Sequence, residues 1–111
     1  MDENTPVLDT IAAMTASSIE NSTLRNRELM LCRIAALAAV DAPAVSYLLN
    51  VGPAADSGVT LEDVQGVLCA VAPIVGTART VTAAANIRKA LGFLILAIEA
   101  EIEAQIEAES R

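Results

Sequence analysis

The stretch from Thr60 to Ala90 constrains the fold most, because it predicts two apolar helices joined at a single glycine. Thr60 and Asp63 have the spacing of a capping box, which marks a helix start. An apolar face at helical spacing follows, made of Val64, Val67, Leu68 and Val71. Gly76 is suited to end this helix and to act as a one-residue hinge. Two such helices side by side would form the centre of an all-helical domain.

The second helix of this pair should run from about Ala78 onward and continue past Gly92 to the end of the chain. We expect its apolar side to consist of Val81, Ala84, Ala85, Ile87 and Leu91. Three helices are predicted upstream, over about 6–19, over about 24–39, and from residue 43 to a kink or end at Gly52-Pro53. The predicted fold is all-α: a compact bundle of about five or six helices with a long C-terminal helix.

The composition predicts one domain over residues 1–111 that shares surface with copies of itself. Hydrophobic residues make up 54% of the chain, yet Tyr47 and Phe93 are its only aromatic residues. The core must therefore be built from Ala, Leu, Val and Ile. A chain this small and this apolar is expected to associate with itself, because one small body covers little apolar surface.

The charge argues against several partners. A net charge of −7 without histidine disfavours nucleic acid and anionic membrane surfaces, which attract Lys and Arg. The apolar run from Gly92 ends at Glu99, short of membrane-spanning length, and the acidic N-terminus lacks the features of a signal peptide. We therefore expect a cytoplasmic protein. The glycines form no phosphate-binding pattern and the cysteines no metal-site spacing, so no cofactor or metal is expected.

Several local motifs point to one family. They are the Gly58-Val59-Thr60 turn before an acidic first turn, the Ala72-Pro73 and Gly76-Thr77 corner, the alanine-rich helix containing Asn86, and the helix of residues 27–40. In these motifs, residues 24–93 resemble the carboxymuconolactone decarboxylase family, which includes the alkylhydroperoxidase D-like proteins. The resemblance implies that family's helical fold and its assembly into trimers or hexamers.

The thiol chemistry of that family is not expected here. Its peroxidase branch carries a Cys-x-x-Cys pair followed by a histidine, and the corresponding positions are approximately Pro43, Ser46 and Asn50. Cys32 and Cys69 lie on separate predicted helices. We expect both to be buried reduced thiols, with a disulfide or a redox pair as the alternatives.

A decarboxylase-like enzyme with a site between subunits is the alternative function. Without histidine, the best candidate for a general acid is Tyr47, with Asn50 and Asn86 as hydrogen-bond partners. The structural alternatives are a Tyr47 that fills the core at a subunit boundary and an Asn86 that bonds a turn carbonyl. A third possibility is a small-molecule binding protein, with an apolar pocket where the helix of residues 43–50 meets the central pair.

Residues 97–111 read as an acidic helical extension. Ile98, Ile102 and Ile106 repeat every four residues, and a stripe of glutamates at the same spacing runs beside them. Like charges at that spacing repel, so the helix needs its isoleucine stripe buried. We expect Leu94, Ile98, Ile102 and Ile106 to form an oligomer interface. The regular repeat fits a natural acidic tail, with a natural scaffold redesigned for assembly as the alternative. The predicted function is a self-associating helical protein, a trimer, hexamer or larger assembly, without recognisable catalytic residues.

Overall fold

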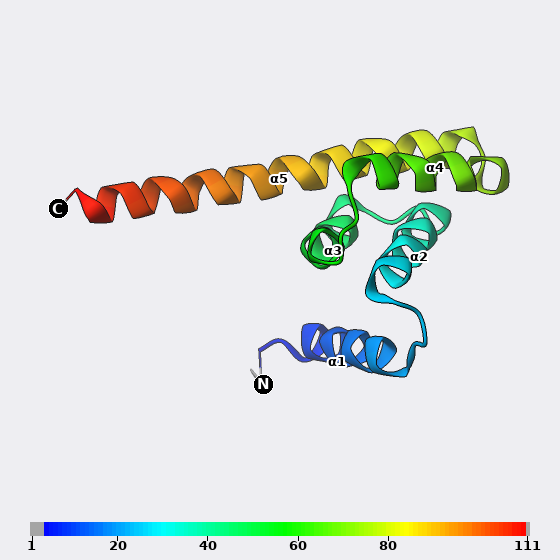
Figure 1. Ribbon diagram of the computed structural model, residues 1–111, viewed down its shortest axis with the longest axis horizontal. Coiled ribbons are helices and arrows are strands. Elements are labelled where there is room, and N and C mark those ends of the chain that lie inside the picture. Colours follow the sequence, from blue (N-terminus) through cyan, green and yellow to red (C-terminus); the bar gives the residue numbers. More distant parts are fainter. Residues whose placement is uncertain (1–3, 111) are drawn as a thin grey trace.

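The computed structural model describes residues 4–110, and these form five helices and no strand (Figure 1). The helices are α1 (Pro6–Asn21), α2 (Asn26–Ala39), α3 (Ala44–Asp56), α4 (Leu61–Val75) and α5 (Thr77–Glu109). This confirms the all-α class and the long C-terminal helix. The bundle is less compact than expected, because only α2, α3, α4 and the first half of α5 pack together. The molecule measures 55 × 30 × 26 Å, since the second half of α5 projects from this body.

The corner between α4 and α5 confirms the hinge predicted from the sequence. At the start of α4, the Thr60 hydroxyl accepts the Asp63 N–H at 3.1 Å, and the Asp63 carboxylate accepts the Thr60 N–H at 2.9 Å. At its end, Gly76 has a φ of +90°, which residues with a side chain rarely adopt. The chain therefore reverses at one residue, and α5 runs back along α4 (Figure 1).

Two small clusters of buried side chains hold the body together. One joins α3 to α5 through Ala38, Ala42, Tyr47, Ala83, Ile87 and Ala90. The other joins α2 to the end of α3 through Leu29, Met30, Ile34 and Ala54. Val64 of α4 packs against both clusters, as its place in the predicted apolar face requires. Alanines supply half of these buried positions, so the helix backbones lie close together while each contact buries little area.

The buried face of α5 differs from the predicted one. Ile87 is buried and Leu91 packs against the core, as predicted. Val81 is 63% exposed and Ala84 and Ala85 are also exposed, whereas Ala83 and Ala90, which were not predicted, are buried. Each residue advances a helix by about 100°, so an error of one residue turns the face well away from its partners. In a helix with alanine on every side, the sequence pattern does not single out one face.

The sequence predicted a kink or an end of the third helix at Gly52-Pro53, and the helix does not end there. Helix α3 runs through Pro53 to Asp56, although Pro53 has no N–H to donate to the preceding turn. Ala54, the next residue, is only 5% exposed and packs in the second cluster, which secures the last turn. The helix then closes at Gly58, with φ +83°, where the Val59 N–H donates to the Ala54 carbonyl at 3.0 Å.

Because α5 lies close to its neighbours, a larger side chain at Ala90 should destabilise the fold. Ala90 has no exposed surface, so Ala90→Leu should lower the free energy of unfolding by about 1–3 kcal/mol through overpacking. Ala85→Leu is the matched control, because Ala85 lies on the exposed side of the same helix. Urea denaturation measures both. Equal losses in the two variants would contradict the assignment of the buried face.

The capping box should make the stability of the fold depend on pH in the acidic range. Hydrogen bonds from Thr60 and the nearby Arg27, at 2.8 Å, hold the pKa of Asp63 below its ordinary value of 3.8. A lowered folded-state pKa stabilises the fold above the unfolded-state pKa, and this gain is lost as the pH falls through the folded-state value. Asp63→Asn should therefore melt below wild type at neutral pH, and the two melting temperatures should converge as the pH falls below the folded-state pKa of Asp63. A gap of constant size over this range would contradict the prediction.

Candidate functional site

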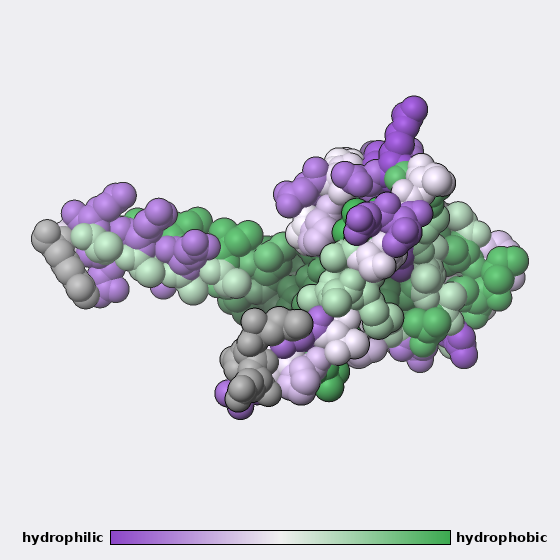
Figure 2. Space-filling view, turned by 90° about the horizontal axis from the view of Figure 1, so that it is seen from below, coloured by the Kyte–Doolittle hydropathy of each residue, from purple (hydrophilic) through white to green (hydrophobic). Residues whose placement is uncertain are grey.

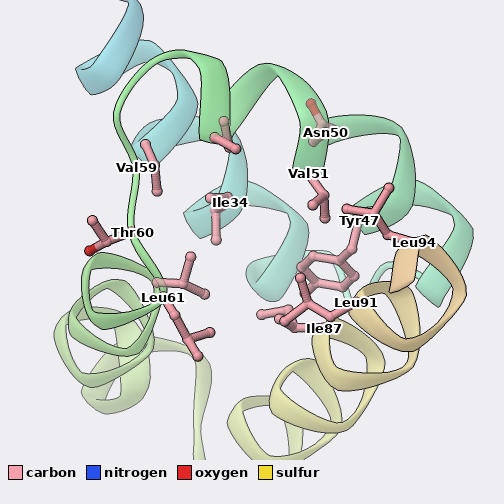
Figure 3. A pocket seen from close by; sticks show the side chains of 13 residues that line it. Ile34, Tyr47, Asn50, Val51, Val59, Thr60, Leu61, Ile87, Leu91 and Leu94 are labelled. Atoms are coloured by element: carbon pink, nitrogen blue, oxygen red, sulfur yellow. The ribbon is translucent and has the colours of Figure 1, made fainter. Parts of the chain in front are cut away.

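The body contains one well-formed apolar pocket, at the junction of α3, the start of α4 and the middle of α5 (Figure 3). Its volume is about 320 Å³, and no charged residue lines it. The lining is Ile34, Tyr47, Asn50, Val51, Ala54, Ala55, Val59, Thr60, Leu61, Val64, Ile87, Leu91 and Leu94. The pocket lies where the sequence predicted one for the small-molecule alternative, at the contact of α3 with the central pair.

Tyr47 is the one large polar side chain in the pocket wall. Its ring lies beside Val51, Ile87 and Leu91 (Figure 3), and the residue is only 3% exposed. Its hydroxyl is buried and has no hydrogen-bond partner among the described residues. Burial raises the pKa of this hydroxyl above 10.0, and the negative charge of Asp41 raises it further. Tyr47 therefore stays protonated at neutral pH and offers a hydrogen-bond donor rather than a base.

The two asparagines proposed as partners of Tyr47 are bound elsewhere. Asn50 lines the pocket, but its amide donates to the Ser46 carbonyl at 2.8 Å and its side chain points away from the pocket centre (Figure 3). Asn86 donates to the carbonyl of Ala42 at 3.2 Å, the turn-carbonyl bond given as its structural alternative. The structure thus brings Tyr47 and Asn50 to one pocket and assigns Asn86 to holding the turn before α3.

Two pocket residues were assigned differently by the sequence. Leu94 was predicted to lie in the oligomer interface, yet it is partly buried and closes one side of the pocket. Val59 was read only as part of a turn, but it packs against the second cluster and reaches the pocket wall. Leu94 continues the helical pattern of Ile87 and Leu91 on α5, so this pattern could have placed it in the pocket wall. Val59 lies in the turn between α3 and α4 and belongs to no periodic pattern.

The cysteines were wrongly expected to be buried. Cys32 on α2 and Cys69 on α4 are both free and exposed. Each lies on the side of its helix that turns away from the two clusters, so neither contributes to the core. Over residues 4–110, no group of three or more metal-ligating side chains comes together.

Exposed apolar side chains dominate both projecting helices. In α1, Val7, Leu8, Ile11, Met14 and Ile19 are all at least 45% exposed. In the second half of α5, Ile98, Ile102 and Ile106 are 47%, 50% and 61% exposed. Figure 2 shows hydrophobic surface continuing from the body along this projecting arm, beside hydrophilic side chains. In the single chain, three of the four predicted interface residues are thus uncovered.

The second half of α5, called the arm, carries negative charges without positive charges beside them among the described residues. Glu99, Glu101, Glu103, Glu107 and Glu109 lie on the second half of α5, and no cation lies there within the described residues. Over that same part of the chain the ion pair between Arg27 and Asp63 is the only one. The arm is therefore acidic along its length and apolar along one stripe.

Helix α5 is also long and apolar enough, by length and composition alone, to cross a membrane. Its charges are placed unfavourably for that role. Its longest uncharged stretch is residues 90–98, between Lys89 and Glu99. At 1.5 Å per residue this segment is about 14 Å long, against about 30 Å for the hydrocarbon layer.

Comparison with family models, with curated proteins and with solved structures finds no match to this chain.

The unpaired hydroxyl makes Tyr47→Phe a revealing substitution. Removing a buried donor without a partner should leave the free energy of unfolding unchanged or raise it by about 1 kcal/mol. Tyr47→Ala, the control for lost packing, should cost about 3–5 kcal/mol. Chemical denaturation compares the two variants. A loss above about 1 kcal/mol in Tyr47→Phe would show that the hydroxyl has a partner in solution.

Proposed function

We propose that this protein is a self-associating helical subunit whose projecting helices are covered by other copies of the same chain. The observation that carries the proposal is the continuity of one face of α5. Within the body, Ile87, Ala90 and Leu91 lie on that face and pack in the core. Beyond Leu94 the same side of the helix continues into Ile98 and Ile102, but the other helices of the chain end before it.

A solitary helix of this composition is poorly stable. An isolated acidic segment without cations loses stability from repulsion between glutamates four residues apart, and it gains little from propensity alone. Burying an isoleucine completely contributes about 1.5–3 kcal/mol, so covering the stripe offsets this repulsion. A second copy can supply the cover, because α1 carries its own uncovered apolar face.

The state of α1 supports the same proposal. It makes at most sparse contact with the other helices, and one side-chain bond, from the Arg33 guanidinium to the Ser18 hydroxyl at 3.1 Å, links it to α2. Val7, Ile11 and Met14 recur at helical spacing on one side of α1. A helix whose apolar side is largely exposed in its own chain is typical of an element that packs in an assembly.

The family resemblance supplies the expected symmetry. If the chain has the carboxymuconolactone decarboxylase-like fold, its assembly is a trimer or a hexamer, and a redesigned tail would extend this to a larger array. Closed rings of identical subunits bury the same patch on every copy. The short uncharged segment of α5 and the acidic surface favour an aqueous, cytoplasmic location for such an assembly.

The enzyme alternative has less support. Tyr47 is the only titratable side chain in the pocket wall, and its raised pKa keeps it a proton donor without an adjacent base. Asn86, the second proposed partner, is engaged with Ala42. A lactone decarboxylase would need further acid–base groups from another subunit to complete this site.

Serine substitutions on the two sides of the arm test the self-association directly. Replacing Ile98, Ile102 and Ile106 by serine should reduce the oligomer to smaller species, because it removes the apolar stripe. Replacing Ala100, Ala104 and Ala108 by serine is the control. It introduces the same three serines on the opposite side of the helix but keeps the isoleucine stripe. Light scattering at micromolar concentration measures both masses. If the isoleucine variant keeps the mass of wild type, the stripe is not an interface.

A further inference from the structure

Helix α5 carries a coiled-coil seam on the side that bears the isoleucine stripe. In a heptad repeat, the side chains that face a second helix follow one another at alternating steps of three and four residues. Seven positions of α5 have this spacing: Val81, Ala84, Arg88, Leu91, Ile95, Ile98 and Ile102. Leu91 is partly buried and the other six are exposed, so the seam is open to solvent in the body as well as along the arm. Only Arg88 among them is charged, which is the composition of a face that packs against another helix.

A hollow lies beside the seam where the seam crosses the body. This α4–α5 hollow has a volume of about 240 Å³ and lies between the two antiparallel helices (Figure 1). Three of its wall residues, Ala84, Arg88 and Leu91, belong to the seam. The rest of the wall is formed by Ile87 and by one side of α4: Leu61, Val64, Gln65 and Leu68. Side chains of a helix lying along the seam would enter this hollow as knobs enter holes.

The charges of α5 are separated along its length. Its cations, Arg79, Arg88 and Lys89, all lie in the first half, and its acidic residues are the five glutamates of the arm. Arg79 donates to the Ala39 carbonyl at 2.6 Å, whereas Arg88 and Lys89 form no ion pair within residues 4–110. Two parallel copies of α5 would bring like charges together. Two antiparallel copies would instead place the glutamates of each arm beside the cations of the other copy.

The same charges argue against two other covers for the arm. Two arms paired only with each other would bring glutamates together without a cation among the described residues. Helix α1 of another copy offers apolar side chains, but its only charged residues are Asp9 and Glu20. Like charges that face each other across an interface weaken association. The first half of α5 combines an exposed apolar seam with positive charge, which neither alternative offers.

We infer that two copies of this chain pair through antiparallel α5 helices, so that the arm of each fills the α4–α5 hollow of the other. The inference rests on the self-association proposed above and identifies the surface that covers the isoleucine stripe. The charges select the register: with Ile102 opposite Ala84 of the partner subunit, Arg88 lies beside Glu99 of the partner subunit. The pair has two-fold symmetry, which a hexamer made of two trimers contains and a single trimer lacks.

A charge exchange between Arg88 and Glu99 tests this arrangement. Arg88→Glu should weaken association by about ten-fold at low ionic strength, because the two-fold pair contains the contact twice. Glu99→Arg should weaken it to a similar extent. The double variant Arg88→Glu/Glu99→Arg restores opposite charges and should associate as tightly as wild type does. Arg25→Glu is the matched control: it changes the net charge equally at an exposed site outside α5, and it should leave association unchanged.

Sedimentation equilibrium of the full chain over a range of concentrations measures association, and circular dichroism checks that each variant keeps its helices. Two results would overturn the antiparallel pair and leave self-association standing. One is an Arg88→Glu variant that associates as tightly as Arg25→Glu, and the other is a double variant that associates as weakly as the single ones. A wild-type chain that stays monomeric would overturn both the pair and the self-association on which it rests.

Discussion

The structure depends on one apolar face of α5 that is longer than the body covering it. The helix has 33 residues, about 50 Å of length, whereas its antiparallel neighbour α4 has 15 and covers less than half of it. Within the body, the face carries buried alanines and Ile87; beyond the body, it carries isoleucines that meet nothing in the same chain. The apolar side chains on such a face are either exposed to water, which is unfavourable, or covered by another molecule.

The alanine-based core explains why the single chain buries so little apolar surface. Ala38 and Ala90 have no exposed surface, and Met30, at 2% exposed, is the most deeply buried large side chain among residues 4–110. Small side chains allow the helix axes to come close, but each removes little apolar area from water. Leucines, isoleucines and valines that would fill the core of a larger domain lie on the surface here instead. Association between copies and occupation of the pocket would each add burial that the single chain lacks.

Local chemistry made the central corner predictable from the sequence. Thr60, Asp63 and Gly76 act through their immediate neighbours, and the capping box and the helix end at Gly76 are those that the sequence predicted. Properties set by distant contacts were missed. The helix continues through Pro53 because Ala54 packs against α2. The buried face of α5 is decided by which of its alanines pack against α3. The amphipathic pattern of helix α1 does not say which partner its apolar side meets.

The candidate site was predictable to the same extent. Tyr47 stood out as the only tyrosine, and the bond of Asn86 to a turn carbonyl had been given as an alternative. The pocket was expected where α3 meets the central pair, but its volume and its walls depend on the packing of four helices. Exposure of Cys32 and Cys69 likewise follows from helix orientation, which the spacing of two cysteines cannot supply.

Sedimentation equilibrium of the full chain, and of a chain ending at Leu96, tests the central claim most directly. The full chain should sediment as a discrete oligomer of identical subunits. The shortened chain, with helical content retained by circular dichroism, should fall to a smaller species because the exposed isoleucine stripe is gone. A monomeric full-length chain at micromolar concentration, or the same oligomer in both, would contradict the account.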